Sequence, residues 1–241
     1  MTVRTILGDL VSAARDQGLV FRGAFAPERE DGVPDVVAGR PAGTLVLLGF
    51  AGREGFPHFA ASPEMADGQP DPLDRWSRRL VEALADRFAG RSLFPFGGPP
   101  YHPFQRWAMR AEDVRPSPLG LLIHPEWGLW HSYRGAIALE ERCMLVPPER
   151  AGPGPCDTCE ERPCLAACPA GAHSGTGFDD ATCFAHLSAP SSAACHQGGC
   201  LSRRACPVGR AHAPGASQAA FTMRAFHRAQ VRRYGSGAER E

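Results

Sequence analysis

The chain has 241 residues, enough for one or two domains, and its 26 basic and 26 acidic side chains cancel to a formal net charge of zero. Zero net charge disfavours nonspecific binding to nucleic acid, and the absence of lysine excludes Schiff-base and P-loop chemistry. No apolar run approaches the ~18 residues that a membrane-spanning helix needs. The opening residues MTVRTILGDLVSAARDQG have charges among their apolar positions, as in an amphipathic helix and unlike a signal peptide. We therefore expect a cytoplasmic protein without a membrane span.

The first half of the chain predicts a mixture of helices and strands. Apolar residues recur at helical spacing from Ile6 to Ala14, and the short apolar runs 19–25 and 44–50 are typical of strands. The clearest helix is predicted over 71–88. Its apolar residues fall on one face, which we interpret as core packing: Leu73, Trp76, Leu80, Leu84 and Phe88.

The start of this helix and the segments that follow it have clear local signals. Asp71 is a suitable N-cap and Pro72 suits the first helical position. A loop rich in glycine and proline is expected over 94–104, followed by a short helix over 105–112.

Two apolar runs, 119–124 and 129–139, then predict strands, and their close spacing predicts a hairpin. The segment 147–155 is rich in proline and glycine and predicts a linker. Near the end of the chain, 216–233 predicts a helix, and the last residues, 235–241, are expected to fray.

Cysteine is concentrated in one segment: eight of the nine cysteines lie between Cys156 and Cys206. In a reducing compartment, dense cysteine indicates metal or redox chemistry rather than disulfides. The first run has the spacing Cys-x2-Cys-x4-Cys-x3-Cys-Pro, and the second run also ends in Cys-Pro. Eight thiolates are what two [4Fe–4S] clusters require. The ninth cysteine, Cys143, is expected to be a small buried side chain.

The spacing also predicts how the thiols divide. In the bacterial run C-x2-C-x2-C-x3-C-P, the fourth cysteine ligates the other cluster; here the middle gap has four residues in place of two. By this crossing rule one cluster takes Cys156, Cys159, Cys164 and Cys206. The other takes Cys168, Cys183, Cys195 and Cys200. Zinc is the alternative, with His173 or His196 as substitute ligands, but the second run lacks the paired knuckles typical of zinc.

Residues 119–139 read LGLLIHPEWGLWHSYRGAIAL. This segment resembles the IHP-x-x-G-x-W-x-x-x-R-G stretch of the intracellular cobalamin-processing (MMACHC) family, which has a nitroreductase-like α+β fold and removes upper-axial ligands from cobalamin. The matching residues, in order and spacing, are His124, Pro125, Gly128, Trp130, Arg134 and Gly135. In that family the arginine at the Arg134 position helps to bind glutathione, so the resemblance implies a binding role for Arg134.

The cysteine half is similar to the dicluster region of epoxyqueuosine reductases and reductive dehalogenases. The segment TCFAHLS over 182–188 resembles their lone-cysteine segment, and the closing Cys-Pro matches theirs. Both kinds of enzyme couple a cobalamin-binding domain to two [4Fe–4S] clusters. The two resemblances together cover about half of the chain.

The sequence therefore predicts an α+β chain in three parts. The resemblances imply a nitroreductase-like, corrinoid-binding domain over 1–148. A ferredoxin-like domain with two [4Fe–4S] clusters is expected over 149–212, and a C-terminal helix and tail over 213–241. The predicted activity is that of a cobalamin reductase or decyanase. An electron donor such as a ferredoxin, a flavodoxin or a reductase would feed the clusters, and the clusters would reduce the cobalt.

Four side chains are predicted to act on the corrinoid. We expect His124 and Arg134 to be catalytic, and these two together with Trp127 and Trp130 to bind the cofactor. The alternative to a functional role is a structural one: His124 would then be an ordinary histidine at the end of a strand, and Trp127 and Trp130 would pack in the core.

Two other functions are compatible with the sequence. The cluster region also suits an epoxyqueuosine-type tRNA reductase, for which the terminal helix offers Arg224, Arg228, Arg232 and Arg233. The second of these functions is that of a ferredoxin-like electron carrier that binds no corrinoid. Arg162, Arg203 and Arg204 lie in or beside the cysteine runs, where positive charge would raise a cluster's potential unless these are solvated surface residues.

Overall fold

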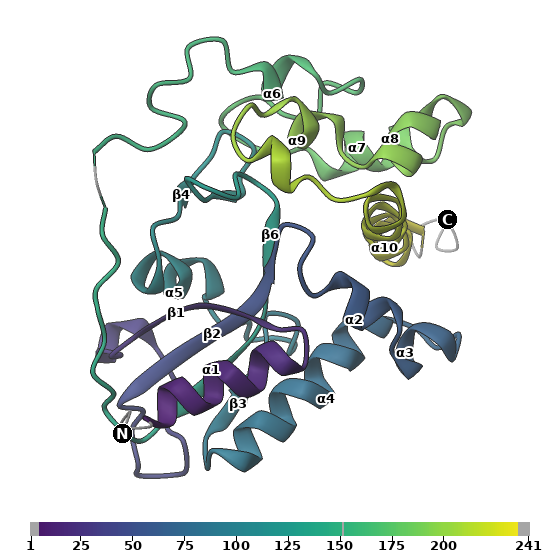
Figure 1. Ribbon diagram of the computed structural model, residues 1–241. Helices are drawn as coiled ribbons and strands as arrows, with labels where there is room; N and C mark the ends of the chain where they lie inside the picture. The colour runs from purple at the N-terminus through teal and green to yellow at the C-terminus, as the bar shows by residue number, and fades with distance from the viewer. Residues whose placement is uncertain (1–4, 151, 236–241) are drawn as a thin grey trace. The chain divides into compact units, whose positions relative to one another are not determined.

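The computed structural model describes residues 5–150 and 152–235 and combines helices with strands, as the α+β class predicts (Figure 1). The described residues form two compact units, one of residues 5–114 and 131–150 and the other of residues 115–130 and 152–235. This division differs from the predicted one in two respects. Residues 115–130 belong with the cysteines, and the terminal helix is part of the cysteine unit. The predicted tail over 236–241 lies outside the described residues.

An antiparallel sheet with the strand order β1-β2-β6-β3 forms the centre of the first unit. Its strands are β1 (Val20–Phe25), β2 (Thr44–Ala51), β3 (Arg91–Leu93) and β6 (His131–Leu139). The longest pairing joins β2 to β6, from Thr44 opposite Leu139 to Ala51 opposite His131. Every residue of β2 is buried, so this strand lies at the core of the unit.

The helices of the first unit are α1 (Ile6–Asp16), α2 (Phe56–Ala60), α3 (Pro63–Ala66), α4 (Pro72–Arg87) and α5 (Phe104–Ala111), with a 3-10 turn η1 (Arg29–Asp31). Of these, α1, α4 and α5 pack against the sheet, and α1 and α4 confirm the predicted periodicities. α1 and α4 lie beside each other, α4 packs on β6, and α5 packs on β1 and β2 (Figure 1). Pro72 begins α4 as predicted, but Asp71 does not cap it, because its backbone is left-handed (φ 50°) and its side chain makes no capping hydrogen bond.

The predicted hairpin between 119–124 and 129–139 is wrong. β5 (Leu122–Ile123) pairs with β4 (Arg115–Pro116) in a small sheet of the second unit, whereas β6 joins the sheet of the first unit. Only an isolated bridge between His124 and Gly128 connects the two sides of the expected turn. β2 has eight residues available for pairing with β6, whereas β5, the strand before the turn, has only two. β6 therefore forms a longer ladder of backbone hydrogen bonds with β2.

The second unit consists of short helices and turns closed by one long helix. The elements are α6 (Pro163–Ala166), α7 (Asp180–Leu187), α8 (Ala193–Gly198), α9 (Leu201–Ala205) and α10 (Ala216–Tyr234), with 3-10 turns η2 (Pro190–Ser192) and η3 (Arg210–His212). α10 confirms the predicted terminal helix and packs on α7 and α8. Within the described ranges, no helix has the length and apolar character needed to cross a membrane.

Candidate metal centres

Eight cysteines of the second unit line two separate cavities, four to each. The first thiol set is Cys156, Cys159, Cys164 and Cys206. The second thiol set is Cys168, Cys183, Cys195 and Cys200. All of them are free thiols, so no disulfide competes for the sulfurs. The grouping coincides with the division expected from the crossing rule, while the presence of iron stays a prediction.

A turn and a short helix position the first thiol set. The turn around Cys156 is closed by Asp157, whose Oδ2 accepts a hydrogen bond from the Gly154 N–H at 2.7 Å. α6 carries Cys164 and is preceded by Arg162 in the left-handed conformation, with φ 41°. Because the residue before a proline is disfavoured in the right-handed helical region, Pro163 helps to set the start of α6 at this point. The longer gap between the second and third cysteines is accommodated here.

The wall of the first thiol set is apolar, and the segment 115–130 contributes to it. Cys164 and Cys206 are buried in one cluster with Leu119, Ile123 and Leu129. This packing explains why 115–130 belongs to the cysteine unit: its apolar side chains are buried against the first thiol set.

Two glycines allow this segment to approach the closing Cys-Pro of the second run. A Cβ on Gly128, where φ is 57°, would lie 2.1 Å from the carbonyl oxygen of Val208. A Cβ on Gly209 would lie 2.4 Å from the carbonyl carbon of Trp127. Gly128 is part of the segment that resembles the cobalamin-processing family, and its local role is this close backbone contact.

The second thiol set is distributed over several helices. Cys183 lies on α7, Cys195 lies on α8, Cys200 is the residue before α9, and Cys168 follows α6. The cavity that they line measures about 200 Å³, compared with about 20 Å³ for the first. Two groups already approach its sulfurs. The Ala172 N–H donates to Cys168 Sγ at 3.4 Å, and His186 Nε2 lies 3.8 Å from Cys195 Sγ.

When no cation is bound, burial favours the protonated form of at least one thiol in each set. Burial, reinforced by the neighbouring thiols of the same set, raises the pKa of Cys156 and of Cys183 to about 11. A metal ligand must be the thiolate, and the positive charge of a bound metal reverses this preference. Metal binding to either set would therefore release protons.

Arg203 is a half-buried residue whose guanidinium is buried beside the second thiol set. It lines the cavity, its Nη2 donates to the carbonyl oxygen of Leu129, and its guanidinium carbon lies 4.8 Å from the ring centre of Trp130. Its Nε is buried without a hydrogen-bond partner, and burial lowers its pKa. No carboxylate of the described residues pairs with it. A buried cation requires nearby negative charge, and negative charge at Cys200 would favour the charged guanidinium.

Two further polar atoms around the second cavity have no partner. Ser202 Oγ and His173 Nδ1 are buried without a hydrogen bond, and both residues line the cavity. Buried polar groups are normally satisfied, so these atoms and Arg203 Nε are suited to contact a polar group bound in the cavity. Four sulfur ligands together with unsatisfied polar atoms fit a negatively charged iron–sulfur cluster.

His124, predicted to contact the corrinoid, is engaged in its own turn. Its Nδ1 accepts hydrogen bonds from the N–H groups of Glu126 at 3.1 Å and Trp127 at 3.3 Å, and its ring stacks on Trp127 at 4.0 Å. Because Nδ1 is the acceptor, the neutral ring carries its proton on Nε2. His124 thus has the tautomer of a hydrogen-bond donor rather than of a metal ligand through Nε2.

The other predicted corrinoid residues are distributed between the two units. Trp127 is half-buried and Trp130 is buried beneath Arg203 in the second unit. Arg134 lies on β6 in the first unit, where its guanidinium pairs with Asp74 and its Nε donates to Ser77 Oγ at 3.0 Å. His124, Trp127 and Trp130 therefore lie in one unit. Arg134 lies in the other unit, where its contacts with Asp74 and Ser77 connect β6 to α4.

A buried ion pair in the first unit was not predicted. Arg22 is fully buried, its Nη2 lies 2.8 Å from Glu112 Oε1, and its Nη1 donates to the carbonyl oxygen of Phe50 at 2.9 Å. The Tyr133 hydroxyl donates to the same carboxylate. Burial, with the nearby charge of Glu112, raises the pKa of this hydroxyl. The only local signal was an arginine inside the apolar run 19–25.

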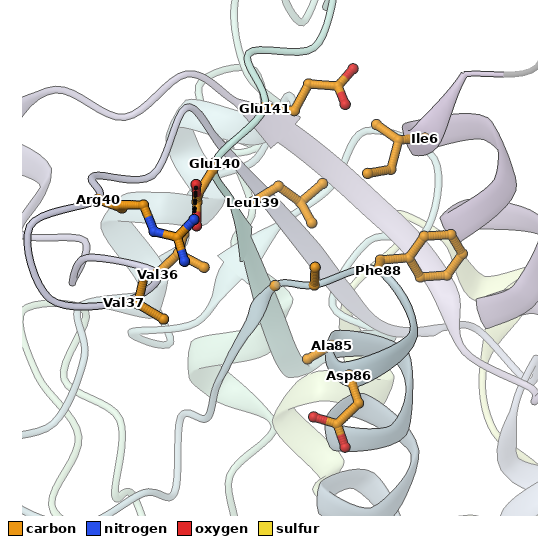
Figure 2. A pocket seen from close by; sticks show the side chains of 12 residues that line it. Ile6, Val36, Val37, Arg40, Ala85, Asp86, Phe88, Leu139, Glu140 and Glu141 are labelled. Atoms are coloured by element: carbon orange, nitrogen blue, oxygen red, sulfur yellow. Dashed lines mark hydrogen bonds and ion pairs between the residues drawn. The ribbon is translucent and has the colours of Figure 1, made fainter.

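The first unit also contains a cavity of about 490 Å³ at the end of β6. Figure 2 shows aliphatic side chains such as Ile6 and Leu139 together with the carboxylates of Asp86 and Glu141. None of the four residues predicted for the corrinoid lines it.

Over residues 5–150 and 152–235, no group of three or more His, Cys, Asp or Glu side chains is arranged to hold a single metal ion. The thiols of each set surround a hollow instead. Comparisons with protein-family models, with curated proteins and with solved structures found no significant match to this chain.

Proposed function

We propose that this chain is an iron–sulfur oxidoreductase that carries one [4Fe–4S] cluster on each thiol set and delivers electrons to a corrinoid substrate. The observation that supports the clusters is the division of eight cysteines into two four-thiol cavities, in the grouping expected from their spacing.

When bound, the clusters would supply one-electron transfer. The protein's own contribution is to hold and surround them. The apolar wall of the first thiol set limits the access of water, and the Ala172 N–H donates to a sulfur of the second set. Arg203 adds a buried positive charge beside the second set, which favours the more negative, reduced form of whatever binds there.

The corrinoid substrate rests on the resemblance of residues 119–139 to the cobalamin-processing family. An electron added to Co(III) enters an orbital that is antibonding along the axial direction, so the upper ligand leaves with its bonding pair and Co(II) remains. The electron comes from an external one-electron carrier. In this proposal His124 would bind a side-chain amide of the corrin.

The experiment that tests both parts uses protein purified without oxygen. We expect about eight iron and eight sulfide atoms per chain, and a shift of the corrin absorption spectrum when cyanocobalamin or hydroxocobalamin is added. Zinc in place of iron would overturn the whole proposal. Intact clusters with no spectral shift and no retained corrinoid would overturn the corrinoid part alone.

A second candidate, an electron carrier that binds no corrinoid, is favoured by one observation. Two of the four residues predicted to bind the corrinoid are engaged inside their own units, Trp130 beneath Arg203 and Arg134 with Asp74. Retention of a corrinoid through gel filtration separates the two candidates, because only the reductase would retain it.

A further inference from the structure

We propose that the exposed arginine face of α10, formed by Arg224, Arg228 and Arg232, is the docking surface for an acidic one-electron carrier protein that delivers electrons to the second thiol set. The inference rests on the proposed function, because it needs a cluster on that set. It adds the entry point for electrons and the charge of the donor.

α10 has two faces with different roles. Met223 and Phe226 line the second cavity, and Gln230 continues the buried side. An α-helix turns about 100° per residue, so Arg228 is about 200° from Phe226 and lies on the opposite side of the helix. Arginines four residues apart form one row along a helix. The row therefore faces away from the cavity that the same helix closes.

The row lies in a stretch of the sequence that is rich in positive charge. Residues 201–235 contain seven arginines and no aspartate or glutamate, although the whole chain has zero net charge. Arg224 and Arg228 are exposed, and neither has a carboxylate partner among the described residues. By contrast, Arg233 on the same helix pairs with Asp180 at 2.6 Å. The net charge of the whole chain is zero, but residues 201–235 have an excess of positive charge.

Position and charge together indicate the kind of partner. A carrier seated on the row is separated from the second cavity by one helix, whose diameter with side chains is about 10–12 Å. Opposite charges steer association and increase its rate, with a strong dependence on ionic strength. The row spans about 12 Å, which suits an acidic patch on a small protein. Zero net charge of the whole chain favours such a protein over RNA as the partner.

The test measures how fast the cluster-loaded protein is reduced by an acidic [2Fe–2S] ferredoxin in stopped-flow mixing. The variant R224E/R228E is compared with R29E/R106E, which makes the same charge change at exposed arginines of the first unit. At low ionic strength we expect the rate constant to fall about tenfold or more for R224E/R228E and to change less than twofold for the control. The difference should disappear at high salt.

Direct reduction by dithionite and the iron content separate the possible outcomes. If both variants keep their iron and respond to dithionite but R224E/R228E shows no selective loss with the ferredoxin, the docking surface is overturned and the proposed function stands. If the parent protein holds no iron, the proposed function itself is overturned. If R224E/R228E abolishes salt-sensitive tRNA binding and leaves reduction by the ferredoxin unchanged, the face binds RNA and this inference is overturned.

Discussion

The two thiol sets offer the same four ligands in different surroundings. The first encloses about 20 Å³ and is walled by prolines and aliphatic side chains, whereas the second encloses about 200 Å³ and is lined by a buried arginine and two unpartnered polar atoms. Arg162 lines the first cavity but is exposed, so water and salt screen its charge. Identical ligands therefore do not imply identical centres. We expect the cluster of the second set to be reduced at the higher potential.

The division into two sets can be broken with paired cysteine substitutions, which have the largest expected effect. Cys206→Ala should remove about half of the iron, since one of the two clusters loses a ligand. Adding Cys164→Ala, in the same set, should remove no more, whereas adding Cys168→Ala should remove nearly all of it. Cys143→Ala is the matched control and should keep the full iron content. Equal iron loss in the two double variants would contradict the crossed grouping.

The close packing behind the first set is tested by Gly128→Ala. A methyl group there would lie 2.1 Å from the Val208 carbonyl oxygen on a backbone with φ 57°. We expect the free energy of unfolding to fall by about 2–4 kcal/mol and the first cluster to become labile. Gly120→Ala is the control, because Gly120 has φ 73° but nothing within 4 Å of its added methyl group.

Urea unfolding monitored by circular dichroism gives both free energies. The control should lose only the backbone strain of about 1–2 kcal/mol. Equal losses for Gly128→Ala and Gly120→Ala would show that the contact with Val208 does not matter.

The buried charge beside the second set is tested by Arg203→Gln. Removing it should make the midpoint potential of one cluster more negative and leave the other unchanged, because positive charge stabilises the reduced form. Arg204→Gln removes an exposed neighbouring charge and should move neither potential. A redox titration followed by electron paramagnetic resonance separates the two clusters. Arg203→Lys should restore part of the shift, which a purely structural role would not require.

Local patterns predicted features that depend on local physics. Cysteine spacing predicted the grouping that the two cavities show, and apolar periodicity predicted α1, α4 and α10. The hairpin prediction failed because β6 pairs with β2, whose partner residues lie 80 to 95 positions earlier in the chain, and no turn signal reveals such a pairing.

The same limit applies to the side chains of the candidate site. A motif around Arg134 could not show that Asp74, 60 positions earlier, holds its guanidinium. The sequence places Arg203 beside the cysteine runs but does not separate it from Arg162 and Arg204. Its burial and its contact with Trp130 depend on the folding of 115–130 against the cysteine segment.

The smallest expected effect is that of a substitution outside both thiol sets, which serves as a reference for the effects of substitutions near the thiols. In the first unit Glu64, at the start of α3, accepts two hydrogen bonds from Arg79 of α4, which hold the pKa of this carboxyl below its usual 4.5. A lowered folded-state pKa contributes stability that is present above the unfolded pKa and is lost as the pH falls through the folded one. Because the Arg79 side chain is 49% exposed, we expect Glu64→Gln to cost no more than about 1 kcal/mol at neutral pH.

This cost should disappear as the pH falls below 4.5 and through the folded-state pKa of Glu64, where the parent carboxyl also becomes neutral. Glu82→Gln on α4 is the control, since the pair of Glu82 with Arg78 is exposed on both sides and 3.4 Å long. That substitution should cost no more than about 0.5 kcal/mol. Urea midpoints for the two variants across this pH range measure the difference. Both variants should keep the full iron content, because neither glutamate lies in the cysteine unit. A loss of iron in Glu64→Gln would instead show that the first unit controls cluster binding. The difference between the two thiol sets would then not be a local property of their surroundings.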